Sequence, residues 1–176
     1  MTSVALVAPD FRRLTVRDAA VLLAIATTAP LFVHMLPSWD AAPLGAHLLP
    51  MFWATFVAAY FYGGTVGALT GLLSPLINML CTALPAWSMV AVLGGELALF
   101  AFVSAWLVRR APGSWYPAPL AAIAAILACS ALQAILPIFG HLPSGRLPVA
   151  SLAAGFPGLV LLGTINFYLV KNHPKR

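Results

Sequence analysis

The sequence predicts an all-α integral membrane protein with six transmembrane helices, and three observations lead to that fold class. Of its 176 residues, 62% are hydrophobic and only 7% are charged, whereas soluble domains carry about 25% charged residues. No Asp, Glu, Lys or Arg occurs from residue 41 to residue 95. The few basic residues gather in short clusters between apolar segments. In a soluble domain every helix or strand exposes part of its surface to water, so the uncharged run is expected to lie in a bilayer. One helical span of a bilayer needs roughly 20 apolar residues.

The apolar segments are expected to be helices because backbone polar groups must be satisfied inside the hydrocarbon. Together they form a single domain over residues 1–176, with no room for a separate nucleotide-binding or catalytic domain. No Gly-rich phosphate loop of the Walker type is present in the sequence, so ATP-driven work would need a partner. The six expected spans are residues 18–36, 44–62, 65–82, 87–108, 118–139 and 149–170.

The first span follows a basic segment at the start of the chain. Its apolar stretch is longer than the core of a signal peptide and lacks a convincing cleavage site after it, so we expect it to be retained as a helix. Ala20, Ala24 and Thr28 form a stripe of small residues on one of its faces. Such a stripe lets another helix approach closely, either inside the protein or from a separate membrane partner.

The second and third spans are joined by the turn Tyr62-Gly-Gly-Thr65. Along the third span Gly63, Gly67 and Gly71 recur at every fourth position and therefore share one helix face. Small residues at that spacing are typical of tight helix packing in lipid.

The remaining spans are bounded by basic residues, which also set the orientation. With six spans all but one of these residues fall on the same side of the membrane, and the positive-inside rule makes that side cytoplasmic. Both termini are therefore expected inside the cell (N-in/C-in). The net charge of +5 follows from these anchors, and nucleic acid is not expected as a partner. The cytoplasmic clusters are Arg12, Arg13 and Arg17, then Arg109 and Arg110, then Lys171, Lys175 and Arg176, with Arg146 alone opposite.

This orientation places most other polar and aromatic candidates at the outer face. They lie in or beside the three outer connections, so an outward-facing site is favoured over a cytoplasmic one. These residues are His34, Trp39, Asp40, His47, Cys81, Trp87, His141 and Arg146.

Cys81 ends the third span, whereas the other cysteine, Cys129, lies inside the fifth. Because the two occupy different apolar segments, a disulfide between them is not expected. A thiolate binds soft or borderline metals, and coordination drives its deprotonation. No second Cys or His follows at a zinc-like spacing, so a lone thiolate suits a metal whose other positions are already filled, as in a corrin or a haem. The alternative is an inert, small apolar residue.

Glu96 is the only acidic residue deep in a span. An unpaired carboxylate is costly in hydrocarbon, so Glu96 is expected to contact a ligand, carry a proton or cap a neighbouring backbone segment.

Several segments in combination resemble the substrate-binding S-component of energy-coupling-factor (ECF) vitamin transporters. They are His47-Leu-Leu-Pro50, the Gly-rich stretch from Tyr62 to Ile77 that runs into Ser-Pro, Ala83-Leu-Pro-Ala86 and Glu96-Leu-Ala98. The resemblance covers the first four spans, and the last two only by topology. It implies a six-helix protein that captures a vitamin at its outer face and topples in the membrane against a coupling subunit driven by two ATPases. Ala20 and Ala24 match the Ala-x-x-x-Ala docking motif of that family.

Within the superfamily, a cysteine at the end of the third span is similar to the small cobalamin-specific BtuM group of Gram-negative bacteria. This resemblance implies that Cys81 ligates the cobalt of cobalamin (vitamin B12), which is bound base-off and taken up across the bacterial inner membrane. It implies a multi-pass transporter subunit and not an enzyme, with cobalamin as transported ligand, membrane lipid around it and no tightly held catalytic cofactor. The ECF coupling subunit is either shared with other S-components or dispensable.

A cobalamin pocket needs aromatic walls and scattered polar groups, because the corrin is broad, apolar and rimmed by amides. The outer connections and the span ends beside them offer both, and His34 and His47 are rival cobalt ligands. The expected substrate-binding residues are His34, Trp39, Asp40, His47, Asn78, Thr82, Pro85, Trp87, Gln133, Phe139, His141 and Arg146.

Three other interpretations stay open. The protein is an S-component for another vitamin with Cys81 only lining the pocket, or a structural subunit without a ligand. Otherwise it is a membrane enzyme with Cys81 as nucleophile, which needs a neighbouring base such as His34 or His47.

Overall fold

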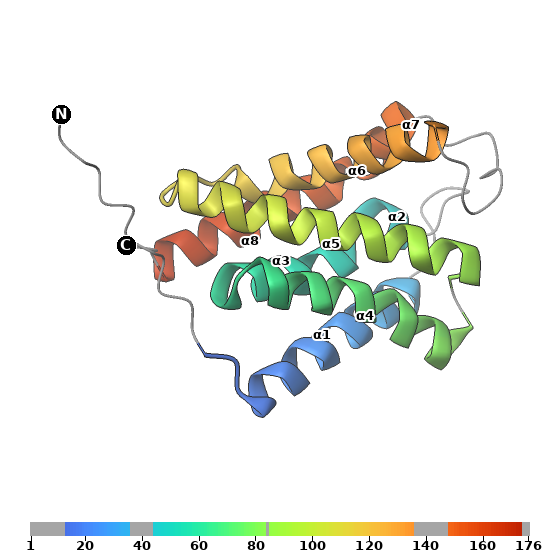
Figure 1. Cartoon of the computed structure of the whole chain (residues 1–176), viewed down its shortest axis with the longest axis horizontal. Coiled ribbons are helices and arrows are strands. Elements are labelled where there is room, and N and C mark those ends of the chain that lie inside the picture. Colours follow the sequence, from blue (N-terminus) through green and yellow to red (C-terminus); the bar gives the residue numbers. More distant parts are fainter. Residues whose placement is uncertain (1–12, 36–43, 84, 136–147, 174–176) are drawn as a thin grey trace.

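The computed structural model describes residues 13–35, 44–83, 85–135 and 148–173. Over these residues the chain is helical and contains no strand, which confirms the predicted all-α class. The long helices lie side by side along one axis (Figure 1). In chain order the helices are α1 (Val16–Met35), α2 (Leu44–Leu48), α3 (Pro50–Tyr62), α4 (Gly64–Thr82), α5 (Trp87–Arg110), α6 (Pro117–Ile135), α7 (Pro148–Ala154) and α8 (Phe156–Asn172).

Within this described part of the chain, four helices are long and apolar enough to cross a membrane: α1, α4, α5 and α6. They correspond to the first, third, fourth and fifth expected spans. The predicted boundaries of α4 and α5 agree with the structure to within two residues. Residues 136–139 of the expected fifth span lie outside the described residues.

The expected second span is not one continuous helix, which corrects the prediction for residues 44–62. It is divided into α2 and α3 at Leu49, whose backbone is left-handed at φ 52° and ψ 47°. Pro50 follows, and a proline disfavours the right-handed helical region for the residue before it. The short α2 therefore ends before α3 begins and does not continue into it.

The expected sixth span is also divided, into α7 and α8 at Gly155. Pro157 stands in the first turn of α8. In a continuous helix its ring would clash with the carbonyl of Ala153, and one backbone hydrogen bond would be lost. A new helix start at Gly155 removes both costs.

The glycine face of α4 packs as predicted. A Cβ atom on Gly67 would lie 2.7 Å from the Cβ of Ala59 in α3, and one on Gly71 would lie 2.8 Å from the Cβ of Leu97 in α5. Contacts that short do not occur between real side chains, so only glycine allows α4 to approach both neighbours this closely. Gly63, with φ 93°, makes the turn between α3 and α4.

The core lies between α3, α5, α6 and α8. Phe52 of α3 meets Phe100 of α5 edge to face, with ring centroids 4.9 Å apart. Tyr60, which is 1% exposed, donates a hydrogen bond from its hydroxyl to the backbone carbonyl of His173 at 2.7 Å. This bond ties the end of α3 to the end of α8.

A polar contact between α1 and α4 depends on a proline. Pro30 lies inside α1 and has no N–H to donate to the carbonyl of Ala26, four residues earlier. That carbonyl instead accepts hydrogen bonds from Ser74 Oγ at 3.1 Å and from Asn78 Nδ2 at 3.3 Å. Both side chains are buried, so α4 supplies the bonds that the proline removes from α1.

Candidate functional site

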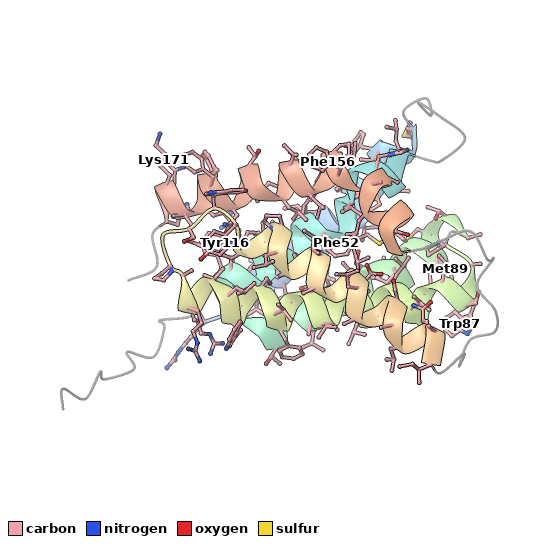
Figure 2. All side chains as sticks on the ribbon, turned by 90° about the horizontal axis from the view of Figure 1, so that it is seen from above. Phe52, Trp87, Met89, Tyr116, Phe156 and Lys171 are labelled. Atoms are coloured by element: carbon pink, nitrogen blue, oxygen red, sulfur yellow. The ribbon has the colours of Figure 1, made fainter. Side chains whose placement is uncertain are left out.

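The two ends of the helix bundle differ in chemistry. The described basic residues lie where α5 and α8 end and α1 begins, and we call this the basic end. Figure 1 shows the last turns of α1, α4 and α6 and the first turn of α5 at the opposite end, together with α2 and α7. Figure 2 labels Trp87 at that opposite end and Lys171 at the basic end. We call the opposite end the Cys81 end.

Cys81 lies in the last turn of α4, and its side chain is exposed. The helix closes one residue after Thr82, where Ala83 adopts a left-handed conformation at φ 58° and its N–H bonds to the carbonyl of Met79 at 2.8 Å. Trp87 begins α5 on the other side of this short connection and is 69% exposed. A thiol and an indole therefore flank the same turn, both open to the surroundings.

Two predicted binding residues lie close to Cys81 in α4: Asn78, one turn below it, and Thr82, the last residue of the helix. Asn78 is 3% exposed, and its Nδ2 is already used by the carbonyls of Ala26 and Ser74. It holds α4 to α1, a structural role that the sequence analysis missed. Thr82 is half-buried, and its hydroxyl donates to the carbonyl of Asn78 at 2.7 Å, within its own helix.

His47 joins α2 to α7. Its Nδ1 lies 2.8 Å from the carbonyl oxygen of Ala154, so Nδ1 must carry the hydrogen, and in the neutral ring Nε2 is an acceptor. Nε2 is buried and has no hydrogen-bond partner among the residues that the structure describes. The main neighbours of α2 are α8, α1 and α7, so His47 is not packed on the helix that carries Cys81.

The remaining predicted residues fall into three groups. Pro85 and Gln133 are half-buried at the Cys81 end. Ala20 and Ala24 are exposed on α1, so the small stripe faces away from the rest of the chain. His34 lies on α1, but its side chain is outside the described structure, as are Trp39, Asp40, Phe139, His141 and Arg146 altogether.

Both thiols are free. Cys129 is half-buried on α6 and lies near enough to Glu96 of α5 for the two groups to interact electrostatically. Among the residues that the structure describes, no three His, Cys, Asp or Glu side chains gather in a way that could hold a metal ion. Cys81 is therefore a single exposed donor and not part of a described ligand cluster.

The signal for the Asn78 contact was present in the sequence. A proline in the middle of one apolar helix leaves a carbonyl without its donor, and Ser74 and Asn78 stand four residues apart in another apolar helix. Pairing the two required knowing that α1 and α4 are neighbours, which the sequence pattern does not state.

The described fold defines the class: an all-helical protein with four helices suited to cross a membrane. Comparisons of the chain with protein-family models, with curated proteins and with solved structures find no match.

Proposed function

We propose that this protein is a transporter subunit of a bacterial inner membrane that captures cobalamin at its outer face, with Cys81 as an axial ligand of the cobalt. The chain crosses the membrane six times, with α2–α3 and α7–α8 each serving as one interrupted span. Both termini are cytoplasmic, so the basic end faces the cytoplasm and the Cys81 end faces outward.

The exposed thiol at the end of α4 is the observation that supports the proposal most strongly. A corrin fills the four equatorial positions of its cobalt, so the protein needs to supply only one axial donor. A thiolate is a suitable soft ligand, and a single accessible thiol matches a metal that arrives with its other positions occupied. Binding through sulfur displaces the vitamin's own base, which gives the base-off form.

Groups around Cys81 suit a large, mainly apolar ligand with a polar rim. Trp87 offers an exposed aromatic face on the same turn, and Thr82 and Pro85 follow the thiol in the chain. Gln133, on α6 at the same end of the bundle, adds an amide. Ligand sites of this kind combine apolar walls with a few polar groups that fix orientation.

The stripe of small residues on α1 is exposed on the side of the bundle and suits a docking helix. Ala20 and Ala24 are exposed, and Val21 and Ile25 beside them are 50% and 45% exposed. Small residues on a membrane helix let a partner backbone approach closely. We propose that the coupling subunit of an ECF module docks here when one is present.

An absorption spectrum of the purified protein mixed with cobalamin tests the proposal. Base-off binding with a sulfur ligand changes the visible spectrum of the corrin, and we expect this change for the unaltered protein. Cys81→Ala should abolish the change, whereas the matched variant Cys129→Ala should keep it. An unaltered protein that leaves the spectrum of cobalamin unchanged would refute the proposed function, and binding that survives in Cys81→Ala would refute the ligand role.

A further inference from the structure

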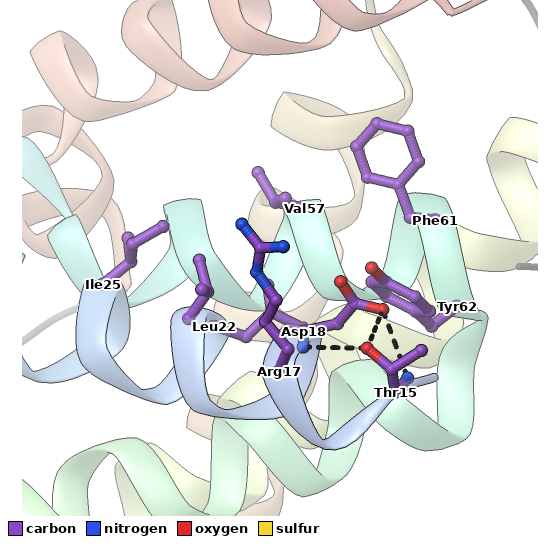
Figure 3. Close-up of a pocket in the computed structure, with 9 residues that line it drawn as sticks. Thr15, Arg17, Asp18, Leu22, Ile25, Val57, Phe61 and Tyr62 are labelled. Atoms are coloured by element: carbon purple, nitrogen blue, oxygen red, sulfur yellow. Dashed lines mark hydrogen bonds between the residues drawn. The ribbon is translucent and has the colours of Figure 1, made fainter. Parts of the chain in front are cut away.

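A groove of about 620 Å³ opens between α1 and α3 at the basic end of the bundle. It lies apart from Cys81, and Val21 and Ile25 line both this groove and the edge of the α1 face proposed above for docking. Its volume falls within the range of roughly 300–1,000 Å³ that is usual for ligand sites. Figure 3 shows its lining side chains converging from the first turns of α1 and the last turns of α3.

The deep part of the groove is apolar. Leu22 and Ile25 line it from α1, and Val57 and Phe61 line it from α3. Leu22 is 6% exposed while Ile25 is 45% exposed, so the wall runs from the protein interior to the outer surface of the bundle. In a membrane protein such a wall is in contact with hydrocarbon, and an acyl chain fills it without loss of hydrogen bonds.

The mouth of the groove carries one positive and one negative side chain, Arg17 and Asp18. Asp18 Oδ2 accepts hydrogen bonds from the backbone N–H of Thr15 at 3.1 Å and from its hydroxyl at 2.7 Å, and the Asp18 N–H donates to Thr15 Oγ1 at 3.2 Å. This reciprocal cap fixes the carboxylate at the start of α1. Tyr62 lies beside the same carboxylate (Figure 3).

The Arg17 side chain extends along the opening of the groove (Figure 3). It makes no ion pair or hydrogen bond with another described residue, although Asp18 is close enough to attract it electrostatically. A guanidinium is well suited to bind phosphate through two parallel hydrogen bonds. At the mouth, the Arg17 guanidinium therefore has N–H groups that no described residue uses, and it lies next to the fixed Asp18 carboxylate.

We propose that this groove binds a phospholipid whose headgroup carries an ammonium beside its phosphate, as phosphatidylethanolamine does. One acyl chain lies along the apolar wall, the phosphate binds the Arg17 guanidinium, and the primary ammonium binds the Asp18 carboxylate. The paired charges favour this zwitterionic lipid over phosphatidylglycerol, an anionic lipid whose headgroup offers no cation to Asp18. They also favour it over a choline lipid, whose quaternary ammonium has no hydrogen to donate.

Native mass spectrometry of the detergent-solubilised full chain tests the proposal with lipids that share the same acyl chains. We expect phosphatidylethanolamine to bind at least about fivefold more tightly than phosphatidylglycerol or phosphatidylcholine. Arg17→Gln should weaken phosphatidylethanolamine binding at least about tenfold, because the charge-assisted hydrogen bonds to the phosphate are lost. The matched control is Arg109→Gln, which removes a cation at the same end of the bundle but outside the groove, and it should leave this binding unchanged.

A second variant tests the carboxylate. Asp18→Asn keeps an oxygen that accepts from Thr15 but removes the charge, so it should abolish the preference for phosphatidylethanolamine over phosphatidylglycerol. Circular dichroism verifies that each variant is folded. The proposal is overturned by tighter binding of phosphatidylglycerol to the unaltered protein, by equal effects of Arg17→Gln and Arg109→Gln, or by an unchanged lipid preference in Asp18→Asn. None of these results depends on cobalamin.

Discussion

The carbonyl of Ala26 gives a sharp test of how α1 and α4 are held together. Pro30 leaves this carbonyl without its usual donor in the helix, and Ser74 and Asn78 replace that donor from α4. The perturbation is the double substitution Ser74→Ala/Asn78→Ala, made once in the natural sequence and once together with Pro30→Ala. In the second background the N–H of residue 30 is available to the carbonyl again.

The expected magnitude follows from the bonds that are lost. Hydrogen bonds between membrane helices contribute about 0.6 kcal/mol on average, and a buried carbonyl left without any donor costs about 1–3 kcal/mol. The double substitution removes both donors to Ala26 and the bond from Asn78 to Ser74. We therefore expect the double substitution to lower the free energy of unfolding by about 2–4 kcal/mol in the natural sequence. In the Pro30→Ala background this loss should be smaller by about 1 kcal/mol or more.

The assay is reversible unfolding in mixed micelles with increasing denaturing detergent, followed by far-ultraviolet circular dichroism. Thr70→Ala is the matched control, because Thr70 is also buried on α4 but its hydroxyl bonds only within its own helix, to Val66 at 2.9 Å. The control should show no dependence on Pro30. If the double substitution costs the same with and without Pro30→Ala, the carbonyl is not what Ser74 and Asn78 satisfy, and the explanation is wrong.

Three further predictions concern packing, a tertiary hydrogen bond and the docking face. Gly71→Ala should lower the free energy of unfolding by about 1–2 kcal/mol, because overpacking against α5 outweighs the gain in helix propensity. Gly95→Ala meets no atom within 4 Å and should be neutral or slightly stabilising in the same unfolding assay, so equal losses in both variants would contradict the packing argument. Tyr60→Phe removes the hydrogen bond to His173 and should lower the free energy of unfolding by about 0.5–1.5 kcal/mol. An unchanged melting temperature would contradict this prediction. Ala24→Leu on the exposed face of α1 should leave cobalamin binding intact but lower uptake in cells that supply a coupling module, and normal uptake would argue against docking there.

Much of the helical pattern could be predicted from the sequence because bilayer thickness and the need to satisfy backbone groups act on local composition. The start of α4 follows from Gly63 and the end of α5 from the Arg109-Arg110 pair, which are local signals. The close packing of Gly67 and Gly71 also follows from spacing alone, since every fourth residue shares a face.

The breaks at Leu49 and Gly155 were not predicted, although each stands next to a proline-bearing helix start. An apolar window average hides such breaks, because Pro50 and Pro157 change the backbone without changing the hydropathy much. Pro30 shows why a proline alone does not decide the outcome, since α1 continues through it with help from α4. Whether a neighbour supplies that help is a tertiary property.

In the candidate site, too, some features follow from the sequence and others depend on tertiary contacts. The place of Cys81 and Trp87 at neighbouring helix ends follows from the expected span boundaries, 65–82 and 87–108. The use of Asn78 inside the protein and the bond from His47 to α7 depend on which helices meet, and sequence spacing does not contain that information. Polar residues in span ends therefore serve helix contacts as well as ligands.

Cobalt K-edge X-ray absorption of the cobalamin-loaded protein measures the atoms bound to the metal. We expect one sulfur atom in the first coordination shell of cobalt in the unaltered protein and in Cys129→Ala, and none in Cys81→Ala. A first shell of only nitrogen, oxygen or carbon atoms in the loaded natural protein, or a sulfur atom that persists in Cys81→Ala, would show that Cys81 does not hold the cobalt.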